Sequence, residues 1–277
     1  MFRLFGKKAS RKRLEHILEG CEPPCFPATT TQLLALLRDP DTPVGDLSSS
    51  LQRDPGLVVR VLRLVNSAAF GLRRPVEDIG HAATILGRAQ LEHLVLGVAV
   101  KSNLPSAPAP GFDASRFWYA SFLRATLAKD LASKLHPADA PRSFAGGLLQ
   151  DMAIPLLAHA RTKEYGPLLE AWHAGDAPHL HELEREALGW SHDEVGGYLA
   201  AEWELPESLA SLIQGHHDSL ELLPALRLVA LLGETSSEHG DEALVERART
   251  DFGLEPDRTR VSLESAQTSA RELAQAL

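Results

Sequence analysis

Cysteine, methionine and aromatic residues are scarce in this chain of 277 residues. It has 2 Cys, 2 Met and 6% aromatic residues, which excludes a disulfide scaffold. Cys21 and Cys25 lie in the segment CEPPC, and a single pair with this spacing is weak evidence for a metal or redox site. With 44% hydrophobic and 23% charged residues, the composition is that of an ordinary globular protein and not of a disordered or collagen-like chain.

Long hydrophobic runs and targeting segments are also absent. The longest apolar stretches, Leu94–Leu96 and Val98–Val100 around Gly97, are far shorter than the ~20 residues that cross a bilayer. The opening MFRLF is too short for the apolar region of a secretory signal, and charged residues follow it. We therefore expect a cytoplasmic protein with reduced thiols.

Several common catalytic motifs have no match. The sequence contains no GxGxxG, GxxxxGK[ST], GxSxG or HExxH segment. Dinucleotide-binding, P-loop, serine-hydrolase and zinc-protease functions therefore lack sequence support. Runs that alternate apolar and polar residues are missing too, which argues against strands.

Charge is distributed unevenly along the chain. Six of the 28 basic residues precede Glu15, the first acidic residue, and the formal net charge is -9. Because the rest of the chain is strongly acidic, we expect no general nucleic-acid binding. We expect residues 1–13 to form a flexible basic arm, with at most transient contact to an anionic membrane surface.

Helical spacing of apolar residues runs through most of the chain. It is clearest in two sets: Leu57, Val61, Leu64 and Val65, then Leu91, Leu94, Val95 and Val98. Proline marks helix starts at Asp54-Pro55 and at Pro206. The pattern predicts an all-α fold with about a dozen helices joined by short turns.

The segment 102–113, SNLPSAPAPGFD, is the strongest break in the helical pattern, because Pro and Gly cannot continue a helix there. It separates two helical halves, which we expect to pack together within one domain, 14–220. The remaining residues, 221–277, form a predicted helical C-terminal extension. Its segment LPALRLVALLGE is apolar enough to pack on that domain.

An ordered series of motifs resembles the HDOD domain family over about residues 20–220. The motifs are Asp54-Pro55-Gly56-Leu57, Asn66-Ser67-Ala68-Ala69-Phe70, Ile79, Ala82, Ala83, Leu86, Gly87, Trp118, Ser121, Gly147-Leu148-Leu149, Asp151, the segment 192–206 and His216-His217. The resemblance implies a multi-helix bundle and a role in bacterial signal transduction, often beside cyclic-di-GMP or stress and motility control.

The resemblance also implies kinship with HD-type metal-dependent phosphohydrolases, including the HD-GYP cyclic dinucleotide phosphodiesterases. Their site needs a first His, a His-Asp pair and further His ligands. At the first two His positions this chain has Ala120 and Gln150. The positions that keep a ligand are Asp151, His192, His216 and His217, followed by the acidic Asp218.

These two replacements indicate a degenerate metal site. Gln150 offers only a neutral amide oxygen, and Ala120 offers no donor atom. A two-metal hydrolytic centre is therefore not expected. We expect no catalytic residues and no cofactor, with weak divalent metal binding by Asp151, His192, His216 and His217 as the residual possibility.

The favoured function is therefore a non-catalytic signalling or regulatory module that acts through protein partners of a bacterial pathway or through ligand sensing. Two alternatives remain. One is a residual metal-dependent phosphohydrolase or phosphodiesterase that uses Asp151 and the retained histidines. The other is a nucleotide sensor that keeps the old pocket without turnover.

Two further groups of residues have competing interpretations. Asn66, Ser67 and Phe70 either end a helix, where Asn tolerates left-handed backbone and bonds nearby groups, or form an interaction motif for a partner. His173, His179 and His181 lie among acidic residues, and we expect them on the solvated surface because i, i+2 spacing places side chains on different helix faces.

Overall fold

The computed structural model describes residues 7–51, 54–174, 179–217, 222–232 and 238–276. Within these ranges every regular element is a helix, and a single isolated β-bridge joins Ala109 to Phe112. The predicted all-α fold is confirmed. No helix in these ranges has the length and apolar character that a membrane span requires.

The helices follow one another with short connections. The first half contains α1 (Lys7–Ile17), α2 (Ala28–Arg38), α3 (Val44–Leu51), α4 (Pro55–Val65), the 3-10 helix η1 (Ala68–Phe70), α5 (Ile79–Leu86) and α6 (Arg88–Asn103). The second half contains α7 (Ala114–Leu135), η2 (Pro137–Asp139), α8 (Ala140–Leu149), α9 (Ala153–Ala160), α10 (Thr162–Ala174), α11 (Leu180–Leu188), α12 (His192–Glu202) and α13 (Glu207–Gln214). The C-terminal helices are α14 (Pro224–Val229), α15 (Glu238–Phe252) and α16 (Pro256–Ala276).

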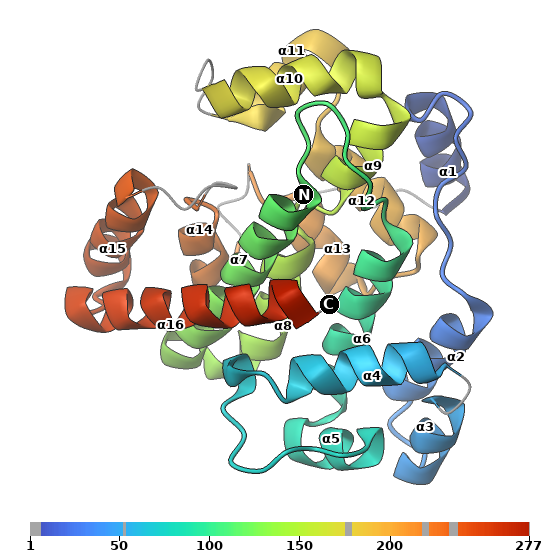
Figure 1. The fold of residues 1–277 in the computed structure, drawn as a ribbon, viewed down its shortest axis with the longest axis vertical. Helices are drawn as coiled ribbons and strands as arrows, with labels where there is room; N and C mark the ends of the chain where they lie inside the picture. Colours follow the sequence, from blue (N-terminus) through green and yellow to red (C-terminus); the bar gives the residue numbers. More distant parts are fainter. Residues whose placement is uncertain (1–6, 52–53, 175–178, 218–221, 233–237, 277) are drawn as a thin grey trace.

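Helix α7 lies at the centre of the molecule and packs against α8, α14 and α16 (Figure 1). It begins where the Asp113 carboxylate accepts hydrogen bonds from the backbone N–H groups of Ser115 and Arg116, an ordinary N-cap. Its side chains are buried on more than one face, including Phe117, Phe122 and the charged Arg124. A helix buried in this way can hold a charged side chain only beside a partner.

Helices α7 and α8 approach each other closely at Gly147. A Cβ atom at this position would lie 2.8 Å from the carbonyl oxygen of Arg124. The missing side chain lets α8 lie against α7, so that Gln150 and Asp151, directly after α8, reach the level of Arg124. The glycine thus positions the candidate site.

The predicted basic arm is wrong for residues 7–13, because the structure places them in helix α1. Ser10, Leu14 and Ile17 are buried at i, i+4 and i+7, so the basic segment carries a packing face toward α12. Arg11 also donates to the carboxylate of Glu202, with 3.1 Å between Nη1 and Oε1. Residues 1–6 lie outside the described residues.

The C-terminal helices pack on the core. Both α14 and α16 contact α7, and Leu226 of α14 lies directly against Gly146 of α8. The two halves of the chain also meet, because α6 packs on α8. The division into a domain, 14–220, and an extension, 221–277, stays a prediction, and these contacts favour one cooperative unit.

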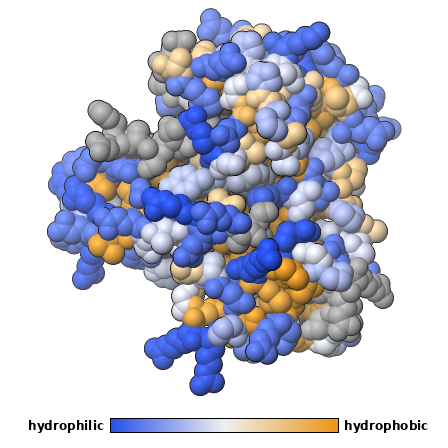
Figure 2. All heavy atoms as spheres, in the orientation of Figure 1, coloured by the Kyte–Doolittle hydropathy of each residue, from blue (hydrophilic) through white to orange (hydrophobic). Residues whose placement is uncertain are grey.

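Helix α4 offers apolar side chains to solvent as well as to the core. Leu57, Val61 and Leu64 are buried, whereas Val59 is 48% exposed. Figure 2 shows an apolar area over α4 on a face that is otherwise mostly hydrophilic. Along the chain, the segment that contains Asn66, Ser67 and Phe70 follows directly after α4.

The close approach at Gly147 can be tested by adding one methyl group. Gly147→Ala should destabilise the fold by about 1–3 kcal/mol, because the new Cβ meets the backbone of α7. Gly45→Ala is the matched control, since a Cβ on Gly45 in α3 has no heavy atom within 4 Å. We expect Gly45→Ala to be stabilising by about 0.5–1 kcal/mol in urea denaturation. Equal stabilities of the two variants would contradict the packing described here.

Candidate metal centre

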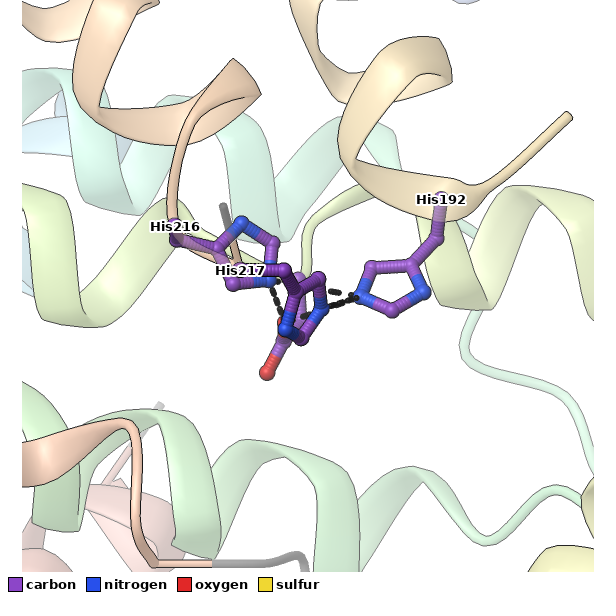
Figure 3. Close-up of side chains that lie close together, drawn as sticks. His192, His216 and His217 are labelled. Atoms are coloured by element: carbon purple, nitrogen blue, oxygen red, sulfur yellow. Dashed lines mark hydrogen bonds and ion pairs between the residues drawn. The ribbon is translucent and has the colours of Figure 1, made fainter. Parts of the chain in front are cut away.

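The four retained ligand residues come together in the structure. Asp151 follows α8, His192 is the first residue of α12, and His216 and His217 follow α13. One ligand atom from each lies within 4.8 Å of all the others. Asp151, His192 and His216 are buried and His217 is half-buried. The three imidazole rings point toward one another (Figure 3).

The distances within this cluster match those expected around a metal ion. His192 Nε2 lies 3.3 Å from His216 Nε2 and 2.9 Å from His217 Nε2. Asp151 Oδ1 lies 3.0 Å from His216 Nε2 and 3.4 Å from His192 Nε2. Ligands bound at about 2.0–2.1 Å around a tetrahedral ion are separated from one another by about 3.3 Å. These four pairs of donor atoms stand near this spacing, and all four donors lie within 4.8 Å of one another.

Glu184 of α11 fixes the orientation of His192. Its side chain is fully buried, and its Oε2 accepts from His192 Nδ1 at 2.7 Å and from the His192 backbone N–H at 2.8 Å. The hydroxyl of Tyr165 donates to the other carboxylate oxygen. With Nδ1 donating to Glu184, the lone pair of His192 Nε2 faces the cluster, as in carboxylate–histidine–metal triads.

His216 is oriented in the same way by the backbone. Its Nδ1 donates to the carbonyl oxygen of Ile213 at 2.7 Å, which leaves the Nε2 lone pair directed at Asp151 and His192. Lone pairs that converge at such distances repel one another unless a cation or a shared proton lies between them. The arrangement therefore fits a metal ion, which requires neutral imidazoles with free lone pairs.

Burial and neighbouring charges set the ionisation of the cluster. Burial would raise the pKa of Asp151, but Arg124 and the imidazoles hold it well below its usual range. Burial and the adjacent imidazoles lower the pKa of His217. Burial opposes the charge on His192, yet Glu184 and Asp151 raise its pKa well above the ordinary value. The anionic form of Asp151 and the neutral form of His217 are the forms that bind a metal, whereas His192 must give up a proton when a metal binds.

Arg124 pairs with the far side of the Asp151 carboxylate. Its Nη2 lies 2.6 Å from Asp151 Oδ2, while Oδ1 faces the histidines. Both partners are almost completely buried. The sequence pattern pointed to neither Arg124 nor Glu184, although each lies at helical spacing from a position of interest: Arg124 is four residues after Ala120, and Glu184 is three residues after His181.

Of the two replaced positions, Gln150 lies beside the cluster, as the resemblance implies. Gln150 is 5% exposed and lines a cavity of about 200 Å³ next to Asp151 and His192. Ala120 is buried on α7, one turn before Arg124. Asp218, which also belonged to the predicted series, lies outside the described residues.

The expectation of a solvated surface is wrong for His181. This side chain is only 9% exposed, and its ring stacks on His217 with 3.9 Å between centroids. His181 and Glu184 are three residues apart and share the inner face of α11. His173 and His179 are exposed, as expected, although His179 also lines the cavity.

Asn66 and Ser67 bond within their own loop. The Asn66 amide donates to the carbonyl oxygen of Val76 at 2.8 Å, and its Oδ1 accepts from the Val76 N–H at 2.7 Å. Ser67 Oγ donates to the carbonyl oxygen of Leu64. Phe70 is half-buried, with Lys129 Nζ 4.0 Å from its ring centroid, and it lines a groove of about 620 Å³ between η1, α7 and α16. Of the three predicted interaction residues, Phe70 is the one that lines a groove.

Replacing Asn66 tests its structural role. Asn66→Ala should destabilise the fold by about 1–2 kcal/mol, because the N–H and C=O groups of the buried Val76 both lose a partner. Asn103→Ala is the control, since Asn103 makes a single bond to the carbonyl oxygen of Ala99 at the end of α6. Urea denaturation compares the two variants. A loss for Asn66→Ala no larger than that for Asn103→Ala would contradict this role.

Comparison with known proteins identifies the family. The HDOD domain model matches residues 24–219, most of the chain. The chain therefore belongs to the HDOD domain family. An uncharacterized protein of Treponema pallidum (strain Nichols) is 26% identical over 196 residues, which cover 70% of this chain and 37% of that protein. This chain thus spans little more than a third of the length of that relative.

Solved structures share the fold. A protein of Shewanella amazonensis SB2B, provisionally named a phosphohydrolase, aligns with a TM-score of 0.74 at 23% identity, over 95% of this chain and 97% of its own. An HDOD domain protein of unknown function from Geobacter sulfurreducens aligns with a TM-score of 0.73 at 23% identity, over 96% and 98%. A protein of Marinobacter aquaeolei VT8, provisionally named a signal transduction protein, aligns with 0.70 at 18% identity, over 100% and 67%.

Proposed function

We propose that this chain is a non-catalytic regulatory module of bacterial signal transduction, which binds one divalent metal ion and acts through a protein partner in the cytoplasm. The observation that carries the proposal is the convergence of Asp151, His192, His216 and His217 within 4.8 Å, with the ring nitrogens of His192 and His216 already oriented by Glu184 and Ile213. A bound ion would hold the ends of α8, α12 and α13 together.

The donor set supports a closed site. Three imidazole nitrogens and one carboxylate oxygen complete a tetrahedral shell for an ion such as Zn²⁺, and structural zinc sites have four protein ligands. Hydrolysis requires a position that stays open for an activated water molecule. Four protein donors within 4.8 Å of one another thus favour a structural ion.

The surroundings of Asp151 support a single ion. In a two-metal site a carboxylate between the ions uses both oxygens as ligands. Here Oδ2 of Asp151 is engaged by the Arg124 guanidinium, and Gln150 and Ala120 provide no imidazole for a second ion. A fixed positive charge at this place repels a second cation.

The names of two structural neighbours and the surface of this chain bear on the regulatory part of the proposal. One structural neighbour carries the provisional name of a signal transduction protein, while another carries that of a phosphohydrolase. On this chain, the apolar area over α4 and the neighbouring Phe70 provide a surface for a protein partner. The second candidate function, phosphoester hydrolysis, is favoured by the 200 Å³ cavity beside the cluster.

Metal content tests the binding site directly. Protein reconstituted with Zn²⁺ and desalted should retain about one ion per chain by mass spectrometry, and its melting temperature should rise, because an ion that binds only the folded state stabilises it. His216→Ala should abolish both effects. His81→Ala, which removes an exposed histidine of α5, is the control and should keep both. A wild-type chain that retains no metal would overturn the proposed site.

Turnover separates the two candidate functions. We expect no hydrolysis of a cyclic dinucleotide or a generic phosphoester above background with Zn²⁺, Mn²⁺ or Fe²⁺, because the four protein donors leave no open position. The assay uses metal-loaded wild type beside His216→Ala. Turnover in the wild type that His216→Ala removes would replace the regulatory proposal with the hydrolytic one.

A further inference from the structure

The cavity beside the metal cluster has hydrogen-bond donors in its wall, together with the Asp151 carboxylate and apolar side chains such as Ile154 and Leu231. Its volume is about 200 Å³, and its walls include Arg124, Gln150, Trp172, His192 and His217. Arg124 is 2% exposed and Gln150 is 5% exposed, so the protein has placed two donor side chains away from bulk water. Burying such groups without partners is costly.

These donors are not used by the described parts of the chain. Arg124 forms an ion pair with Asp151 through Nη2 and donates to the carbonyl oxygen of Leu232 through Nη1 at 3.4 Å. Its buried Nε has no hydrogen-bond partner there. Within the same residues the side-chain amide of Gln150 and the indole N–H of Trp172 also have no hydrogen bond. All three groups are hydrogen-bond donors without an acceptor among the described residues.

The charge balance of the loaded site indicates that this acceptor is an anion. Among the described residues at the cluster, a divalent ion and Arg124 would carry three positive charges, whereas Asp151 and Glu184 carry two negative charges. The neighbouring Asp193 is paired with Arg185 and leaves the balance unchanged. A net positive charge among largely buried groups attracts a counter-anion more strongly than the same charge in bulk water.

The size of the cavity limits the anion. A water molecule takes about 30 Å³, so 200 Å³ corresponds to six or seven waters, enough for a tetrahedral oxyanion with its hydration. Pockets for drug-sized ligands measure about 300–1,000 Å³. The cavity is therefore too small for a dinucleotide.

We propose that this cavity binds a small inorganic oxyanion, such as phosphate, through the donors of Arg124, Gln150 and Trp172, beside the metal ion but without replacing any of its four protein ligands. The inference rests on the proposed metal site. In this arrangement the side-chain amide of Gln150 donates a hydrogen bond to the anion. The HD-type hydrolases have a metal ligand at this position. The module then responds to the oxyanion and the metal together.

Calorimetry of the full chain tests the inference. Zn²⁺-loaded, desalted protein is titrated with inorganic phosphate and, in parallel, with sulfate, which separates oxyanion recognition from a preference for phosphate. Metal content is measured before and after each titration. We expect one phosphate per chain, and binding to the metal-free protein at least about tenfold weaker, because the ion supplies the net positive charge.

Variants assign the binding to the cavity. Gln150→Met keeps the side-chain volume and removes the donor, so binding should weaken about tenfold, the loss of one hydrogen bond to a charged group, with metal content unchanged. Gln90→Met is the matched control, since Gln90 is also buried at 5% and its amide nitrogen also has no partner, but it does not line this cavity. Arg124→Lys keeps the charge beside Asp151 and loses the planar fork, and it should weaken binding as well.

The outcomes separate this inference from the proposed function. Zinc-loaded wild type that binds neither phosphate nor sulfate overturns the oxyanion site and leaves the metal site standing. Equal weakening by Gln150→Met and Gln90→Met also overturns it. If the chain takes up no metal, the proposed function fails, and the metal-free protein decides: phosphate binding that Gln150→Met weakens supports the cavity, and absence of binding overturns it.

Discussion

The buried carboxylate of Asp151 is the constraint on which the site and much of the fold depend. A charge removed from water in this way requires partners on every side. Arg124 supplies one from α7, while His192 and His216 supply others from α12 and the end of α13. Asp151 itself follows α8, so one side chain ties four helices of the second half together. The glycine contact between α7 and α8 makes this meeting sterically possible.

A second buried carboxylate adds negative charge beside the cluster and favours the proposed cation. Glu184 is fully buried and is held by Tyr165 and by two donors of His192. One guanidinium cannot neutralise both Glu184 and Asp151. Without a metal ion, the two carboxylates raise the pKa of His192, so that its imidazolium supplies the second positive charge. A metal ion would provide the same positive charge and would also accept the lone pairs of all three imidazoles. A single proton shared among the three rings cannot accept all of these lone pairs.

Sequence analysis predicted the helical fold and the four residues of the cluster because both leave local signals. The spacing of apolar residues predicts the helices. The ordered motifs shared with the HDOD domain family identify Asp151, His192, His216 and His217. Arg124, Glu184 and His181 were missed because charged residues at helical spacing are usually exposed, and burial depends on which helix packs against them. The prediction of a flexible arm was wrong for residues 7–13 for a related reason. Most residues there are charged, and the buried face of α1 includes only Ser10 before it continues through Leu14 and Ile17.

The replacement of a histidine by Gln150 is therefore more than the loss of a ligand. A site that lost one ligand and changed nothing else would hold a loosely bound second ion and an unsatisfied carboxylate oxygen. Here the Arg124 guanidinium engages that oxygen, and its permanent charge cannot dissociate as an ion can. The amide of Gln150 adds donor capacity to the cavity on the same side. In the proposed site, Arg124 and Gln150 together offer donors to an anion at a place where a two-metal hydrolase holds a second cation, and this physical difference would distinguish a sensing site from a hydrolytic one.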